Sequence, residues 1–218
     1  MRFDIITIFP ELFPPYLTES ILGRAQEKKL VQTEIHNLRD FTRDSHKKVD
    51  DKPYGGGPGM VLQIEPLTRV LTGIPREKKN LVILFSATGK QFDAKLATQW
   101  ARKYEQIIMI AGRYEGVDER IKKIAKIQEV SIGPYVLTGG ELPALVVMDA
   151  VARHIPGVLG DAESLEEKRY GIGVPAYTRP EVFPWKGKKY RVPSVLLSGN
   201  HKKIEAWRAL QKPRDAVG

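Results

Sequence analysis

The sequence alternates short apolar runs with amphipathic stretches through most of its length. Runs rich in Ile and Val predict strands at 3–9, 81–87, 106–112 and 128–132. Between them, apolar positions at helical spacing predict helices at 93–103, 117–125 and 141–155. Strands that alternate with helices form βαβ units, in which parallel strands are covered by helices on both faces. The sequence therefore predicts an α/β fold on an open, mainly parallel sheet.

The composition is that of a packed protein with an excess of basic residues. Hydrophobic residues make up 42% of the 218 and charged residues 28%. The sequence contains no cysteine, which excludes disulfides, Cys-ligated zinc and thiol nucleophiles. The apolar runs are too short to cross a bilayer, and the N-terminus lacks a signal-peptide pattern. We therefore expect a cytoplasmic protein with no membrane contact.

The basic excess is concentrated near the C-terminus. The net charge is +9, and residues 183–214 hold nine Lys or Arg against one acid, Glu205. Trp185, Tyr190 and Trp207 are interleaved with these basic residues. Such a mixture is typical of surfaces that neutralise phosphates and stack on bases, although a solvated basic face would have the same composition. Residues 201–211 read as a helix with Ser198 or Asn200 as its N-cap.

Glycine-bearing loops follow three of the predicted strands, at 86–89, 112–116 and 132–140. In an open α/β sheet, ligands bind beyond the carboxyl ends of the strands, and glycine lets the backbone approach them closely. These loops therefore predict a small-molecule pocket. The sequence has no P-loop motif, and a dinucleotide-like glycine pattern at 171–176 follows no predicted strand. The four histidines show no zinc-ligand spacing.

Five segments carry a more specific resemblance. They read VDDKPYGGGPGM at 49–60, AGRYEGVDER at 111–120, SIGPYVLTGGELP at 131–143, YTRP at 177–180 and LLSGNH at 196–201. With these segments in this order, the chain resembles the bacterial tRNA (guanine-N1)-methyltransferases of the SPOUT superfamily. Enzymes of this family transfer a methyl group from S-adenosylmethionine to the guanine at tRNA position 37, next to the anticodon.

The resemblance implies a specific architecture. Residues 1–158 would form a SPOUT domain whose mainly parallel sheet ends in a C-terminal trefoil knot. Residues 159–176 would be a flexible linker, and residues 177–218 a small, mostly helical, basic tRNA-binding domain. The family also implies a homodimer with active sites at the subunit interface. Some members need Mg2+, but this sequence contains no recognisable metal site.

The resemblance also assigns residues to the site. It places catalysis on Arg153 and Glu115. The implied cofactor residues are Ser86, Gly112, Ile132, Gly133, Pro134, Tyr135, Val136, Leu137, Gly139 and Gly140. The implied RNA-binding residues are Asp50, Tyr54, Gly57, Lys188, Arg191, His201 and Arg208.

The general base is the position at which this sequence departs from the family. Guanine N1 is protonated at neutral pH, so its methylation needs a base and a group that stabilises charge on O6. The guanidinium of Arg153 suits O6, although a surface arginine paired with Asp149 would fit the same spacing. Lys168 occupies the position of the family's linker aspartate. We hypothesise that Glu167 acts as the base, with a solvated linker acid as the alternative.

Two other functions remain compatible with the sequence. The first is a SPOUT methyltransferase that acts on a different RNA position. The second is a tRNA- or rRNA-binding protein that has lost catalysis, an alternative raised by Lys168.

Overall fold

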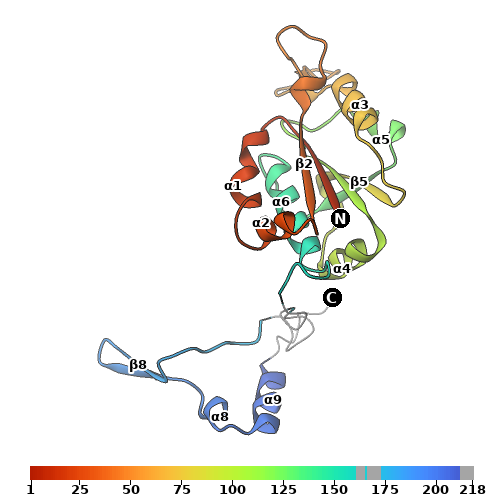
Figure 1. The fold of residues 1–218 in the computed structure, drawn as a ribbon. Helices are drawn as coiled ribbons and strands as arrows, with labels where there is room; N and C mark the ends of the chain where they lie inside the picture. The colour runs from red at the N-terminus through yellow and green to blue at the C-terminus, as the bar shows by residue number, and fades with distance from the viewer. Residues whose placement is uncertain (161–164, 166–172, 212–218) are drawn as a thin grey trace. The chain divides into compact units, whose positions relative to one another are not determined.

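The computed structural model describes residues 1–160, 165 and 173–211. The chain divides into two compact units, Met1–Gly160 and Asp161–Gly218, which are described separately below (Figure 1). Within the described residues, no helix has both the length and the apolar character needed to cross a membrane.

The elements of the first unit are β1 (Arg2–Thr7), η1 (Pro10–Leu12), α1 (Pro14–Leu17), α2 (Ser20–Glu27), β2 (Gln32–Asn37), η2 (Leu38–Phe41), β3 (Asp50–Asp51), β4 (Val61–Leu62), α3 (Ile64–Gly73), β5 (Asn80–Gln91), α4 (Ala94–Lys103), β6 (Gln106–Ile110), α5 (Ile121–Ile124), β7 (Ile127–Ser131) and α6 (Glu141–Ala152). The described elements of the second unit are β8 (Val182–Trp185), β9 (Lys188–Arg191), α8 (Ser194–Leu197) and α9 (His201–Leu210).

A five-stranded sheet in the order β2-β1-β6-β5-β7 forms the centre of the first unit. Every strand pair in it is parallel. Residues of α1, α2, α4 and α6 pack in one apolar core, and residues of α3 and α5 pack in the other. The predicted α/β class and mainly parallel sheet are confirmed, with helices on both faces.

Alternating side chains of the strands supply both cores. In β1, Phe3 and Ile5 belong to one core, whereas Ile6 belongs to the other. All five residues of the central strand β6 are buried, which explains why the four that follow Gln106 are all apolar. The predicted Asn200 cap is present, since its side-chain oxygen accepts a hydrogen bond from the Lys203 amide at 3.2 Å.

Three expectations from the sequence differ from the structure. Strand β2 was not predicted because its sequence, QTEIHN, is largely polar and it lies at the sheet edge. Strand β5 continues to Gln91 instead of ending in a loop at Ser86, with a register break between Phe85 and Lys90. The helix predicted at 117–125 is reduced to the single turn α5, since residues 117–120 lie outside it.

A polar network is buried at the amino end of the sheet. The carboxylate of Asp4 is fully buried and accepts hydrogen bonds from Arg2 at 2.7 and 2.8 Å and from Gln106 at 2.7 Å. The His36 ring lies 2.8 Å from the same carboxylate. Burial opposes ionisation of Asp4, but hydrogen bonds from His36, Arg2 and Gln106 outweigh it and hold its pKa below the usual range.

This lowered pKa predicts a pH-dependent contribution to stability. A carboxyl whose pKa is lower in the folded protein than in the unfolded chain stabilises the fold. This stabilisation is fully present above the pKa of the unfolded chain, about 3.9 for Asp, and it is lost as the pH falls through the lower pKa of the folded protein. We expect Asp4→Asn to lower the free energy of unfolding by about 2 kcal/mol at pH 7. Urea denaturation of both proteins should show the difference shrinking below about pH 4. A constant difference from pH 7 to pH 3 would contradict this account.

Candidate active site

A cavity of about 280 Å3 opens at the carboxyl ends of β6 and β7 and beside the irregular part of β5. Three segments form its walls, around 84–87, 112–117 and 129–140. The sequence-predicted residues that line it are Ser86, Gly112, Glu115, Ile132, Gly133, Tyr135, Val136, Leu137, Gly139 and Gly140. Of the predicted cofactor residues, all of which the structure describes, Pro134 does not line it. The cavity therefore brings together parts of all three segments that the sequence singled out, although the first of them belongs to β5 and is not a loop.

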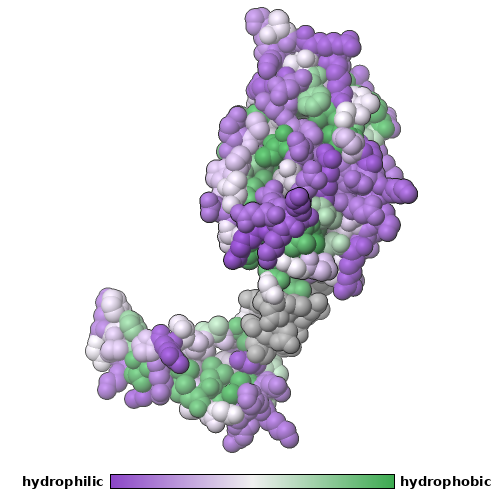
Figure 2. All heavy atoms as spheres, viewed as in Figure 1, coloured by the Kyte–Doolittle hydropathy of each residue, from purple (hydrophilic) through white to green (hydrophobic). Residues whose placement is uncertain are grey.

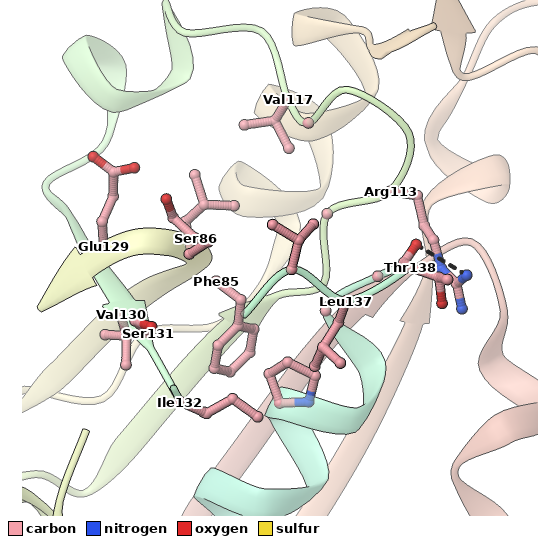
Figure 3. A pocket seen from close by; sticks show the side chains of 18 of the residues that line it. Phe85, Ser86, Arg113, Val117, Glu129, Val130, Ser131, Ile132, Leu137 and Thr138 are labelled. Atoms are coloured by element: carbon pink, nitrogen blue, oxygen red, sulfur yellow. Dashed lines mark hydrogen bonds between the residues drawn. The ribbon is translucent and has the colours of Figure 1, made fainter. Parts of the chain in front are cut away.

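One part of the cavity wall is apolar. Figure 3 shows the side chains of Phe85, Ile132 and Leu137 gathered on one side, with Glu129 farther away beside Ser86. Tyr135 folds back over this loop, since its hydroxyl donates to the carbonyl of Ile132 at 3.2 Å. A planar apolar group fits such a wall, and exposed backbone groups of the glycine loops can read its polar edge.

The second and third wall segments touch each other directly. The amide of Gly140 donates to the carbonyl of Gly112 at 2.9 Å, and Arg113 forms an isolated β-bridge with Gly139. A Cβ atom on Gly140 would lie only 2.6 Å from the Cα of Ala111. Glycine is therefore required at this crossing because two backbones meet there.

Buried Glu141 ties the crossing to the first strand of the sheet. Its carboxylate accepts hydrogen bonds from Nε of Arg113 at 2.8 Å and from the hydroxyl of Thr7 at 2.9 Å. Arg113 also donates to the carbonyl of Thr138 at 3.2 Å and lies over the ring of Phe9, 4.7 Å from its centroid. Only 3% of the Glu141 side chain is exposed. Sequence reasoning missed this residue; its one local signal is an acid directly after two glycines.

Charged side chains line the open part of the cavity. Lys122 pairs with Glu119 at 2.8 Å and with Glu129 at 2.9 Å. The Glu115 side chain rests against Gly59, where a Cβ would lie 2.5 Å from the carboxylate oxygen. The amide of Glu115 also donates to the carbonyl of Met60 at 3.0 Å. The glycine loop at 54–59 is thereby attached to the cavity through Glu115.

Arg153 lies away from this cavity, directly after the last residue of α6. Gly140 and Pro143, at the opposite end of the helix, line the cavity. Twelve helical residues separate the two ends by about 18 Å, which exceeds the reach of an arginine side chain. The structure therefore does not bring Arg153 into the cavity of its own chain. Asp149, the residue considered as its partner, accepts a hydrogen bond from the Tyr16 hydroxyl.

The predicted RNA-binding residues fall into two groups, one in each unit. Asp50 begins the short strand β3, and the loop that follows it contains Gly57 and the fully exposed Tyr54. In the second unit, Lys188 and Arg191 lie on β9, while His201 and Arg208 lie seven residues apart on α9. A spacing of seven places the last two on one helix face.

The proposed base, Glu167, and Lys168 lie outside the described residues. The assignment of Glu167 stays a prediction, which unchanged turnover of Glu167→Gln would contradict. Within the described part of the chain, no group of three or more His, Asp and Glu side chains could hold a metal ion.

Comparison with known proteins identifies the family of the chain. The family model for tRNA (guanine-1)-methyltransferase TrmD matches residues 1–217. A relative from Dictyoglomus turgidum is 51% identical over 211 residues, covering 95% of this chain and 83% of its own length. One from Carboxydothermus hydrogenoformans is 48% identical over 214 residues, covering 97% and 82%. Both are named tRNA (guanine-N(1)-)-methyltransferase. The chain therefore belongs to the tRNA (guanine-1)-methyltransferase family of enzymes.

Proposed function

We propose that this enzyme transfers the methyl group of S-adenosylmethionine to N1 of the guanine at tRNA position 37. Membership of the family implies the cofactor, the tRNA substrate and the position. The observation that carries the proposal is the cavity built by the irregular part of β5 and by the loops at the carboxyl ends of β6 and β7, where α/β folds bind small ligands.

The lining residues fit S-adenosylmethionine. The apolar wall of Phe85, Ile132 and Leu137 suits an adenine ring, and the glycine loops offer backbone groups to its edge. Glu115 supplies negative charge that suits a sulfonium cation. When bound, the cofactor supplies an already activated methyl group. The chain must then position the guanine and move one proton.

Different residues of the chain would bind guanine O6, orient the target base and accept the N1 proton. Arg153 would donate hydrogen bonds to guanine O6, where negative charge grows as N1 loses its proton. Glu115, held against Gly59, would orient the target base beside the cavity. Glu167 is our proposed acceptor of the N1 proton. The loop with Tyr54 and Gly57 would present the target base after it leaves the anticodon-loop stack.

The proposed role of Arg153 predicts a loss of kcat when its planar fork is removed. We expect Arg153→Lys to lower kcat about 10- to 100-fold, because lysine keeps the charge but not the fork geometry. Affinity for S-adenosylmethionine should change less than about twofold, since the proposed contact of Arg153 is with guanine O6 and not with the cofactor. Steady-state kinetics and calorimetric titration separate the two effects. The matched control is Arg102→Lys, at an exposed position of α4, and a loss of kcat shared by both variants would contradict the role.

We propose a homodimer whose active sites combine both copies. Arg153 lies ten residues beyond Pro143, about 15 Å along the helix from this lining residue of its own cavity, so in our proposal a second copy supplies the arginine of each site. An exposed apolar patch on α1, η1 and α6 supports this assembly. It contains Leu12, Tyr16, Leu142 and Val146, which are 51%, 47%, 64% and 47% exposed.

The dimer proposal predicts that a charge in this patch separates the copies. We expect Leu142→Glu to sediment as a monomer and to lose methyl transfer, because Arg153 can no longer reach a cavity. Ile124→Glu, on the exposed side of α5, is the control and should remain dimeric. An active monomer of Leu142→Glu would exclude the shared site.

Finer features of the family complete the proposal. The crossing of Gly140 over Ala111 and Gly112 supports a trefoil knot in residues 1–158. The basic second unit supports a linker at 159–176 and a tRNA-binding domain at 177–218.

The position assignment is tested with two tRNA transcripts that differ only at position 37. Labelled S-adenosylmethionine should methylate the transcript with guanine and leave the one with adenine unlabelled. Equal labelling of both would place the target elsewhere in the RNA. Cofactor binding without labelling of either would support a binding protein without catalysis.

A further inference from the structure

The hairpin β8–β9 of the second unit presents a sheet face of aromatic rings. Its register pairs Phe183 with Tyr190 and Trp185 with Lys188, so these four side chains share one face. The Phe183 and Trp185 rings are nearly parallel, with 16° between their planes and centroids 6.4 Å apart. That spacing matches alternate residues on one side of a strand.

The backbone of the hairpin holds this face in place. A two-residue turn, Lys186-Gly187, connects the strands, and both residues have positive φ, 47° and 75°. Positive φ at both positions gives a type I′ turn, whose twist matches that of the flanking strands. Figure 1 shows the hairpin extending away from α8 and α9 within the second unit.

The rings are open to solvent although they are apolar. Phe183, Trp185 and Tyr190 are 51%, 55% and 55% exposed. An apolar patch of this kind on a well-formed hairpin indicates a binding surface. Figure 2 shows that apolar and strongly hydrophilic side chains lie next to each other in the second unit.

Charge indicates which partner covers the rings. Residues 183–191 contain Lys186, Lys188, Lys189 and Arg191 and no acid. Lys189 and Arg191 lie on the face opposite the rings, so cations surround the aromatic surface on both sides. A second copy of this chain, with the same basic hairpin, would be repelled, whereas RNA phosphates would be attracted.

We propose that this aromatic face stacks on unpaired nucleotides of the tRNA substrate. Aromatic side chains on a sheet face bind unstacked bases in RNA-binding domains, and the surrounding cations hold the backbone. The surface shares no residue with the lining of the cofactor cavity, and it would add base stacking to the phosphate contacts expected of Lys188 and Arg191. The inference takes one thing from the proposed function, namely that the RNA bound is tRNA.

Matched variants of the full-length protein test the surface. Trp185→Val and Tyr190→Val remove a ring but keep a strand-forming residue, whereas Tyr190→Phe keeps the ring. Lys189→Gln removes a charge from the opposite face. The probes are a tRNA transcript, a fully paired RNA duplex and heparin, a polyanion without bases.

We expect the two Val variants to bind tRNA about 5- to 100-fold more weakly than the wild type. Their binding to duplex and heparin should be unchanged, because neither probe offers an unstacked base. Tyr190→Phe should bind tRNA like the wild type. Lys189→Gln should weaken all three complexes and reduce the slope of log K against log salt by about 1.

Two results would overturn the proposal. Wild-type affinity of both Val variants for tRNA would exclude stacking, and equal losses for tRNA and duplex would make the surface purely electrostatic. These binding measurements need no methyl transfer. If the proposed function were wrong but the stacking surface real, the wild type would show no methyl transfer, and the two Val variants would still bind tRNA more weakly than the wild type.

Discussion

Replacing Glu141 by alanine should lower the free energy of unfolding by about 3–5 kcal/mol. The change leaves the guanidinium of Arg113, whose side chain is only 20% exposed, without the carboxylate that pairs with it. It also removes the acceptor for the Thr7 hydroxyl. A buried charge left without its partner destabilises a fold by more than the intact ion pair stabilises it. We therefore expect this substitution to cause one of the largest losses of folding stability in the first unit.

The same substitution should weaken cofactor binding in whatever fraction stays folded. Arg113 holds the carbonyl of Thr138 and lines the cavity, so its release loosens two wall segments at once. We expect the Kd for S-adenosylmethionine to rise at least about tenfold. Urea denaturation and calorimetric titration measure the two effects.

A control separates the buried pair from surface pairs. Glu65→Ala removes the partner of Arg69 on α3, where the Glu65 side chain is 66% exposed. Exposed pairs contribute about 0–1 kcal/mol, so this variant should be nearly neutral. Similar losses for Glu65→Ala and Glu141→Ala would contradict the importance assigned to burial.

Gly140→Ala should have the second large effect. The new methyl group would lie 2.6 Å from the Cα of Ala111 and 3.0 Å from the amide nitrogen of Gly112. Both contacts are with backbone, which cannot rotate away as a side chain can. We expect destabilisation of about 1–3 kcal/mol, because the two loops must separate to admit the methyl group. Separation would also break the 2.9 Å hydrogen bond from Gly140 to Gly112 and open the cavity wall.

The matched control for this variant is Gly160→Ala. Leaving aside its two chain neighbours, no atom of the described residues lies within 4 Å of a Cβ at Gly160, so the change should alter the free energy of unfolding by less than about 0.5 kcal/mol. Cofactor titration should separate the variants as well, with weakened binding in Gly140→Ala alone. Two variants of equal stability and equal affinity would show that the crossing tolerates a side chain.

The strands and loops that form the cavity could be predicted from local sequence. Strand β6 is apolar at its last four positions because both of its faces are buried, which makes the run from Ile107 to Ile110 easy to recognise. Glycines directly after such runs indicated where a ligand approaches the backbone. Edge strand β2 lacks this signal, since one side of it has no neighbouring strand and its sequence is accordingly polar.

Contacts between distant segments could not be read from spacing. Glu141 meets Arg113 across 28 residues and Thr7 across 134, and no local pattern encodes either contact. The same holds for Gly140, whose need for glycine arises from Ala111 on another loop. The hairpin β8–β9 was recognised only as a basic and aromatic composition, because positive φ at Lys186 is unusual for a residue with a side chain.

Identifying the methylated atom tests the central claim most directly. The protein is incubated with S-adenosylmethionine and a tRNA transcript carrying guanine at position 37, and the RNA is digested to nucleosides for mass spectrometry. The account predicts 1-methylguanosine, close to one per tRNA at completion. A different methylated nucleoside, or none from a protein that binds both substrates, would contradict it.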